Sequence, residues 1–215
     1  MSKIQKIGEL VQNHLSQPQI TSPRFRLNLS SRNIRGFLSV FYEQEVKARG
    51  ASFKVSDELT QVIVNSTRQL TADNGKLGII YCGMCGNGKT TILRAISAMI
   101  DHLCEMGWCN ETMPILSARK IAELSSDNVR FSNICNLPLL GIDDLGAEAS
   151  EVVVYGNIKK PLTELLEYRY DRQLYTIITT NLPPKDIGTI YGERVADRFR
   201  ETIVPIVFTN KSYRQ

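Results

Sequence analysis

Residues 77–100 read LGIIYCGMCGNGKTTILRAISAMI, and this stretch decides the fold. An apolar run of strand length, residues 77–82, leads into GMCGNGKT, which fits the pattern G-x-x-x-x-G-K-[ST] without a mismatch. The segment that follows, residues 90–106, has apolar side chains at helical spacing. A glycine-rich loop between a strand and a helix is the context that a phosphate-binding loop requires, and a chance glycine turn would not have it.

The residue types in this loop suit a nucleoside triphosphate. Backbone N–H groups of such a loop can point at phosphate oxygens, and the N-terminus of the next helix adds partial positive charge. We expect Lys89 to neutralise the β- and γ-phosphates and Thr90 to place its hydroxyl on Mg²⁺. The predicted ATP-binding residues are Gly83, Cys85, Gly86, Asn87, Gly88, Lys89, Thr90 and Thr91.

Elsewhere, short apolar runs alternate with longer amphipathic segments. Four further runs predict strands, at residues 114–117, 138–143, 175–180 and 203–208. Segments 118–124 and 158–171 predict helices between them, and the polar pair at 56–57 can start another before the loop. Strands alternating with helices favour a parallel sheet covered on both faces. The predicted fold is an α/β three-layer sandwich with a five-stranded parallel sheet.

Two of the predicted strands end in polar side chains. The run Leu139–Ile142 ends in Asp143 and Asp144, and the run 177–180 ends in Asn181. Strands of a parallel sheet end at one edge, which is the edge that carries the phosphate loop. We expect Asp143 to face Mg²⁺ through water, Asp144 to polarise an attacking water, and Asn181 to hold that water or contact the γ-phosphate. Ordinary turns are the alternative for both segments.

Arg194 and Arg198 are four residues apart, so they share one face of a helix. Two interpretations fit this spacing. The arginines form surface ion pairs with Glu193 and Asp197, or one of them is supplied to the γ-phosphate of a neighbouring subunit. The sequence alone leaves both open.

The N-terminal quarter of the chain is basic. Residues 1–54 hold nine lysine or arginine residues and three acidic ones, whereas the whole 215-residue chain has a net charge of +4. Ser30 or Ser31 can start a helix with its apolar face at Ile34, Phe37, Leu38 and Phe41. Arginines interleaved with aromatics suit single-stranded DNA, although core packing is the stronger reading for Phe37 and Phe41. The arm arginines are Arg24, Arg26, Arg32 and Arg35.

Composition narrows the class of protein. Apolar residues make up 42% of the chain, which is enough for a packed core, and no run of about 18 apolar residues exists. The start of the chain lacks the apolar centre of an export signal, and five cysteines are an odd number. We therefore expect reduced thiols, a cytoplasmic location and no membrane partner.

The motifs above, in this order, resemble the AAA+ ATPases, and more narrowly the DnaC-like helicase loaders with their IstB-like transposition relatives. The similarity covers about residues 52–215, after a basic N-terminal arm and helix at residues 1–51, which we expect to be separate. The phosphate loop alone is common to many families, and the segments that point to this group of AAA+ ATPases are Asp143-Asp144-Leu145-Gly146-Ala147-Glu148, Tyr168-Arg169-Tyr170-Asp171-Arg172, Ile178-Thr179-Thr180-Asn181-Leu182, Gly192-Glu193-Arg194-Val195 with Asp197-Arg198, and Ser212-Tyr213-Arg214.

The resemblance implies a role for each predicted site residue and no separate helical lid domain. By this resemblance, Lys89 and Thr90 belong to Walker A, and Asp143 and Asp144 belong to Walker B. Asn181 is sensor 1, Arg198 or else Arg194 is the arginine finger, and Arg214 is a sensor-like arginine. The second Walker B acid is Asp where many AAA+ proteins have Glu, so its shorter reach puts the rate of hydrolysis in question.

The resemblance also implies a function. It is Mg²⁺-dependent ATP hydrolysis by a head-to-tail assembly that loads a replicative helicase onto single-stranded DNA. An IstB-like helper that binds target DNA and partners a transposase is the alternative. Two further hypotheses are a slow-hydrolysing ATP switch and a small-molecule kinase. A kinase would not require the elements that contain Asn181 and Arg198.

Overall fold

The computed structural model describes residues 24–154 and 156–210 of the chain. Its centre is a parallel sheet with the strand order β2-β3-β6-β1-β7. The strands are β1 (Gly78–Gly83), β2 (Ile115–Ser117), β3 (Leu139–Leu145), β6 (Tyr175–Thr180) and β7 (Ile203–Phe208). The five-stranded parallel sheet predicted from the apolar runs is thereby confirmed, with β1 and the loop that follows it near the middle.

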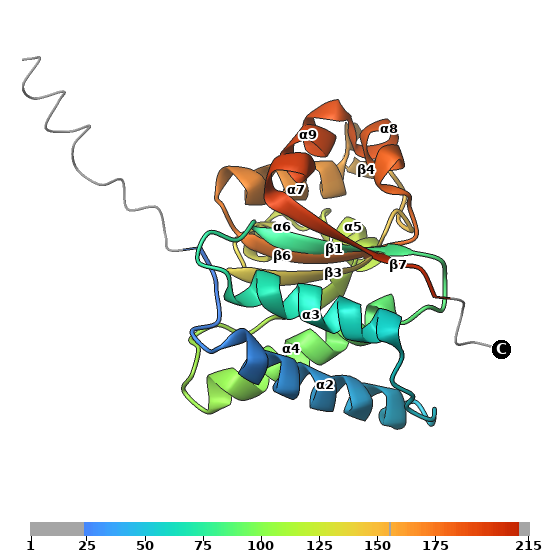
Figure 1. Cartoon of the computed structure of the whole chain (residues 1–215). Coiled ribbons are helices and arrows are strands. Elements are labelled where there is room, and N and C mark those ends of the chain that lie inside the picture. The colour runs from blue at the N-terminus through green and yellow to red at the C-terminus, as the bar shows by residue number, and fades with distance from the viewer. Residues whose placement is uncertain (1–23, 155, 211–215) are drawn as a thin grey trace, which may run out of the picture.

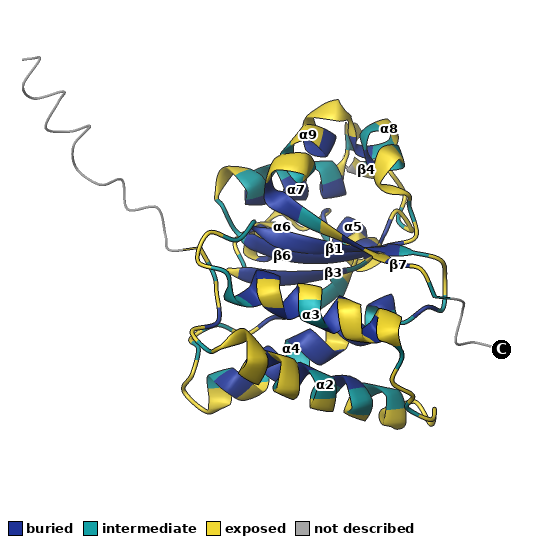
Figure 2. Cartoon of the chain, in the orientation of Figure 1, coloured by how far each residue is buried: buried dark blue, intermediate teal, exposed yellow. Residues whose placement is uncertain are grey.

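Helices cover both faces of this sheet (Figure 1). On one face lie α3 (Asp57–Thr71) and α4 (Lys89–Glu105). On the other lie α5 (Ala118–Leu124), α6 (Asn128–Cys135), α7 (Pro161–Asp171), a 3₁₀ turn (Pro184–Asp186), α8 (Ile187–Tyr191) and α9 (Glu193–Thr202). Figure 2 shows the central strands of the sheet buried between these layers, whereas the edge strand β7 is partly exposed. The three-layer α/β sandwich is therefore the observed architecture.

The sheet is apolar on both faces because each face has its own core. In β1, Ile79 and Tyr81 belong to the cluster beneath α3 and α4, whereas Ile80 and Cys82 belong to the cluster on the opposite side. Successive side chains of a strand point to opposite faces, so two covered faces require the unbroken apolar run that the sequence has.

The helix predicted after Ser30 or Ser31 is α2 (Ser31–Ala48), and Ser30 caps it by accepting a hydrogen bond from the Asn33 amide at 3.2 Å. It packs against α4 as an outer layer, with Ile34 and Leu38 fully buried in the same core as α3 and α4 (Figure 1). The division of the chain at residue 51 stays a prediction, but the described part of the arm is packed onto the body.

One stretch differs from its predicted structure. The helix predicted from Ile158 begins at Pro161, and the residues before it form a hairpin of β4 (Val152–Val154) and β5 (Asn157–Lys159). Gly156 reverses the chain with a φ of 80°, which glycine adopts at no steric cost, and Pro161 occupies the first turn of the helix. The sequence pattern predicted no helix at the positions of α6 and α8.

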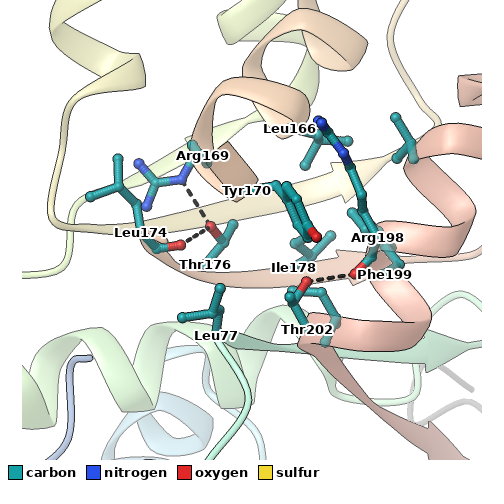
Figure 3. Close-up of a pocket in the computed structure, with 12 residues that line it drawn as sticks. Leu77, Leu166, Arg169, Tyr170, Leu174, Thr176, Ile178, Arg198, Phe199 and Thr202 are labelled. Carbon is teal, nitrogen blue, oxygen red and sulfur yellow. Dashed lines mark hydrogen bonds between the residues drawn. The ribbon is translucent and has the colours of Figure 1, made fainter. Parts of the chain in front are cut away.

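A buried arginine joins α7 to the start of β6. Arg169 donates to the carbonyls of Leu137 and Tyr175, both at 2.6 Å, and to the Thr176 hydroxyl at 2.8 Å. Figure 3 shows its guanidinium directed at Thr176. Burial lowers the pKa of Arg169 to about 10, so the group remains charged at neutral pH. Arg169 of the Tyr168–Arg172 segment is therefore structural, since neutral oxygens surround its charge.

Within residues 24–154 and 156–210, no helix has the length and apolar character needed to cross a membrane.

Candidate nucleotide-binding site

The predicted phosphate loop opens into a cavity of about 640 Å³ at the carboxyl edge of the sheet. That volume is in the range of sites for small ligands and cofactors. The loop supplies residues 85–91 to its wall, and two more predicted residues, Asp144 and Asn181, come from the ends of β3 and β6. The sheet edge therefore gathers three of the predicted elements around one space, as their strand positions require.

The loop runs from the end of β1 to the start of α4, and glycine is required at its first position. A Cβ at Gly83 would lie 2.4 Å from Asn87 Nδ2 and 2.8 Å from the carbonyl oxygen of Phe208. Gly88 is the N-cap of α4 with a φ of 102°, in the left-handed region that other residues avoid. The backbone thus curls tightly over the N-terminus of α4, where unpaired N–H groups favour an anion.

Lys89 lies inside this loop. Its Nζ donates to the carbonyls of Met84 at 2.7 Å and Gly83 at 2.8 Å, and to Asn87 Oδ1 at 3.1 Å. Desolvation lowers the pKa of Lys89, while Asp144 and other nearby groups oppose that shift. Among the described residues, no carboxylate lies within ion-pair distance of this ammonium group. A buried cation held by neutral oxygens is suited to binding an anion.

The residues of the loop fit a triphosphate. Asn87 is fully buried, and its Nδ2 has no hydrogen-bond partner within the described structure. An unpaired buried donor of this kind is uncommon, and it adds to the donors already gathered around the loop. Asn210, just after β7, donates to the Asn87 carbonyl at 3.1 Å and so links the loop to the neighbouring strand.

Oxygen groups suited to Mg²⁺ meet beside the loop. The Thr90 hydroxyl donates to Asp143 Oδ1 at 2.9 Å, so a residue of α4 and a residue of β3 are in direct contact. Hard divalent cations bind through hydroxyl, carboxylate and water oxygens, and these two side chains supply the first two. The donor set thus fits the predicted metal.

Asp144 has an unusual backbone. The register of β3 against β6 shifts between Ile142 and Leu145, and Asp144 adopts a φ of 56° within this bulge. Its side chain turns toward the cavity, which Asn181 also lines from the end of β6. The two side chains predicted to act on water are therefore placed on one wall.

The loop after Asp144 is anchored to the opposite layer. Glu148 Oε1 accepts a hydrogen bond from the Tyr191 hydroxyl at 2.5 Å, and its Oε2 accepts one from the Gly146 amide at 2.9 Å. Both oxygens are therefore engaged, and the contact ties the end of β3 to α8.

The sequence did not identify the second wall of the cavity. It is formed by the end of α2, the linker to α3 and the first turn of α3. The residues are Tyr42, Val46, Arg49, Ala51, Ser52, Phe53, Lys54 and Leu59, and the sequence gave no reason to place them at a nucleotide site. They reach the phosphate loop because α2 packs alongside α4. This tertiary contact leaves no local signal in the sequence.

Arg194 and Arg198 do not line this cavity. Arg198 is bound within its own chain, since it donates to Asp171 at 2.9 Å and lies 4.4 Å from the centre of the Tyr170 ring. Figure 3 shows it beside that ring. Arg194 pairs with Glu167 at 3.4 Å, and its side chain is 69% exposed. The predicted ion pairs with Glu193 and Asp197 are made instead by Arg200. Arg214 lies outside the described residues.

No protein-family model matches the sequence, and no curated protein is similar to it in sequence. Solved structures are similar in fold. The DnaC helicase loader superposes with a TM-score of 0.56 and 20% identity, over 73% of this chain and 93% of that one. DnaI gives a TM-score of 0.56 and 23% identity, over 73% of this chain and 88% of that one.

A third similar structure is the replication initiator DnaA bound to AMPPCP and single-stranded DNA. It gives a TM-score of 0.52 and 15% identity, over 72% of this chain and 48% of that one. At identities this low, the structural similarity shows the fold alone. The chain therefore shares its α/β fold with the DnaC helicase loader and DnaI.

Proposed function

We propose that this protein binds and hydrolyses ATP with Mg²⁺ and acts on DNA as a loader of a replicative helicase. The observation that carries the ATPase proposal is the buried Lys89 ammonium inside a glycine-dependent loop, beside the Thr90–Asp143 pair. The structure of DnaA with AMPPCP, a fold relative, supports it.

Each part of the site has a task in this proposal. Backbone N–H groups of the loop and the Lys89 ammonium bind the β- and γ-phosphates, and the wall from α2 and the linker encloses the base and sugar. Thr90 and Asp143 would hold Mg²⁺, which would neutralise charge that develops on the phosphates. Asp144 and Asn181 orient the attacking water from the opposite wall.

The choice of a helicase as the partner rests on similarity to the DnaC helicase loader and DnaI. A transposase partner is the alternative that the sequence left open. Because both partners would use the same nucleotide site, that site does not separate them, and the partner must be identified directly.

Single-stranded DNA is the proposed nucleic-acid ligand, and the arm arginines differ in their availability for it. Arg26 forms an ion pair with Asp73, and Arg24 donates to Gly75 and Gln173. Arg32 and Arg35 are exposed on α2. Phe37 packs edge-on against Trp108 with ring centroids 5.9 Å apart and lies against the apolar core, which favours packing over base stacking for that ring.

We also propose head-to-tail self-association in which α9 completes a neighbour's nucleotide site. Arg198 remains the first candidate for the arginine that acts across the interface, and the exposed Arg194 is the second. Neither side chain reaches the cavity of its own subunit, which is what action on a neighbour requires.

The first prediction concerns Lys89. Lys89→Ala removes the buried cation, so we expect ATP affinity to fall by about 10- to 100-fold, the range for a hydrogen bond to a charged group. Calorimetric titration with Mg²⁺ present measures it. Arg94→Ala is the control, because Arg94 is exposed one turn further along the same helix. Equal affinities for Lys89→Ala and the wild type would contradict the proposed site.

The second prediction concerns α9. We expect Arg198→Ala to lower ATP turnover by about 10³-fold while ATP binding persists. Mixing it with Lys89→Ala should restore turnover, because at equal amounts about a quarter of head-to-tail interfaces combine an intact loop with an intact arginine. Arg200→Ala is the matched control on the same helix. If the mixture stays inactive, Arg198 does not act across an interface, and Arg194→Ala is tested in the same way.

The third prediction concerns DNA. Replacing Arg32 and Arg35 by Ala should weaken binding of single-stranded DNA and flatten its salt dependence by about 1.4 in the log–log slope, or about 0.7 for each phosphate contact. Replacing Arg24 and Arg26 should change the slope less, since the body of the protein already binds these two side chains. Fluorescence anisotropy over a salt series measures both variants, and an unchanged slope in the first would remove α2 from the DNA interface.

The fourth prediction concerns the partner. Affinity capture on the purified protein with ATP and Mg²⁺ should recover a replicative helicase, and Lys89→Ala should recover much less of it. Recovery of a transposase in its place would support the alternative function.

A further inference from the structure

Thr179 occupies a position between the two acidic residues of the site. It lies on β6 and is fully buried. Its hydroxyl donates to Asp143 Oδ1 at 2.7 Å and accepts a hydrogen bond from the Asp144 amide at 2.9 Å. One side chain of the neighbouring strand therefore contacts both acidic residues of β3.

The bulge in β3 explains why Asp144 requires such a partner. The positive φ of Asp144 and the register shift after Ile142 take its N–H away from the regular ladder with β6. A buried backbone N–H without a partner costs as much as a lost hydrogen bond. The Thr179 hydroxyl supplies the missing acceptor and so stabilises the bulge that turns Asp144 toward the cavity.

The same hydroxyl also fixes the direction of the second hydrogen bond. A threonine hydroxyl has one proton to donate. With the Asp144 amide pointing at its oxygen, that proton is directed at Asp143 Oδ1, which also accepts from Thr90 at 2.9 Å. A chain of hydrogen bonds thus runs from the Asp144 amide through Thr179 and Asp143 to the phosphate loop.

We propose that Thr179 is a positioning residue for Mg²⁺–nucleotide binding, which holds the Asp143 carboxylate in orientation and the Asp144 backbone in its bulge. The proposal rests on the function proposed above. Residues that hydrogen-bond to a metal-binding carboxylate orient it, and their loss costs about 10- to 100-fold in metal affinity or activity. Thr179 does this from a different strand, so β6 contributes to the metal side of the site as well as through Asn181.

The adjacent Thr180 provides a matched comparison. It is fully buried on the same strand and also makes two hydrogen bonds, to the Leu145 carbonyl at 2.6 Å and from the Leu182 amide at 3.0 Å. Neither bond involves a carboxylate. Thr180→Val therefore removes a buried hydroxyl and two hydrogen bonds without changing a contact to Asp143 or Asp144.

The test compares ATP affinity with Mg²⁺ and with EDTA in the full chain, by calorimetry, for the wild type and three variants. In EDTA, we expect Thr179→Val to bind ATP with an affinity within about twofold of the wild type. The factor by which Mg²⁺ raises ATP affinity, called the Mg²⁺ enhancement below, should be smaller by about 10-fold or more. Thr179→Ser retains a hydroxyl and should keep the enhancement. Thr180→Val should keep it too, although its melting temperature should fall.

Several outcomes would overturn the proposal. The proposal fails if Thr179→Val has the same Mg²⁺ enhancement as the wild type. It also fails if Thr180→Val loses as much of the enhancement as Thr179→Val, because that result would indicate a general packing effect. If Thr179→Val does not fold, Thr179→Cys replaces it. Its weak hydrogen-bonding thiol should give an intermediate enhancement, and an unchanged one would overturn the proposal. If the wild-type protein binds no ATP even with Mg²⁺ present, the proposed function itself fails, and Thr179 loses its role with it.

Discussion

Burial of the sheet on both faces is the constraint on which the rest of this structure depends. The four central residues of β1 are buried, and β6 is buried along its full length, so polar side chains there must be satisfied inside the sheet. A polar group without a partner would be costly in such a layer. Groups that bind ligands are therefore confined to the strand ends, where the chain leaves the sheet. In a parallel sheet, the carboxyl ends lie at one edge, so Gly83, Asp144 and Asn181 come together without being close in the chain.

This constraint also explains why much of the site could be predicted from the sequence. An apolar run followed by GMCGNGKT, and other apolar runs that end in Asp143 or Asn181, place chemistry at a sheet edge before any contact is known. Strand length and period determine the position, and residue type suggests the role. The arginines of α9 show where this reasoning ends, because their helical spacing is visible in the sequence but the ring of Tyr170 beside Arg198 is not.

The features that could not be predicted all depend on tertiary packing. The wall from α2 exists because that helix lies along α4, a contact between segments that are far apart in the sequence. The apolar face of α2 predicts that one side of this helix is buried, but the sequence does not show which element covers that side. The bulge at Asp144 is similar, because its amide donates a hydrogen bond to the Thr179 hydroxyl of another strand, a contact that no local pattern reveals. Even the hairpin before α7 was missed, since Ile158 suits a helix face as well as a strand.

The contacts of the phosphate loop extend to its neighbouring strands in two directions. On one side, Asn210 donates to the Asn87 carbonyl, and the Phe208 carbonyl lies where a side chain at Gly83 would be, so the end of β7 and the loop cannot move independently. On the other side, Thr90 contacts Asp143, and Thr179 connects that carboxylate to β6. A ligand that rearranged Lys89 or Thr90 would therefore act on β7, β3 and β6 together. Since Glu148 ties the end of β3 to Tyr191, the same contacts lead toward α8 and the adjoining α9. Packed elements with fixed hydrogen bonds can transmit such a change, because they shift between discrete arrangements rather than deform continuously. A connected path of this kind, from the phosphate loop to the helix that carries Arg194 and Arg198, is what an assembly controlled by its nucleotide would require.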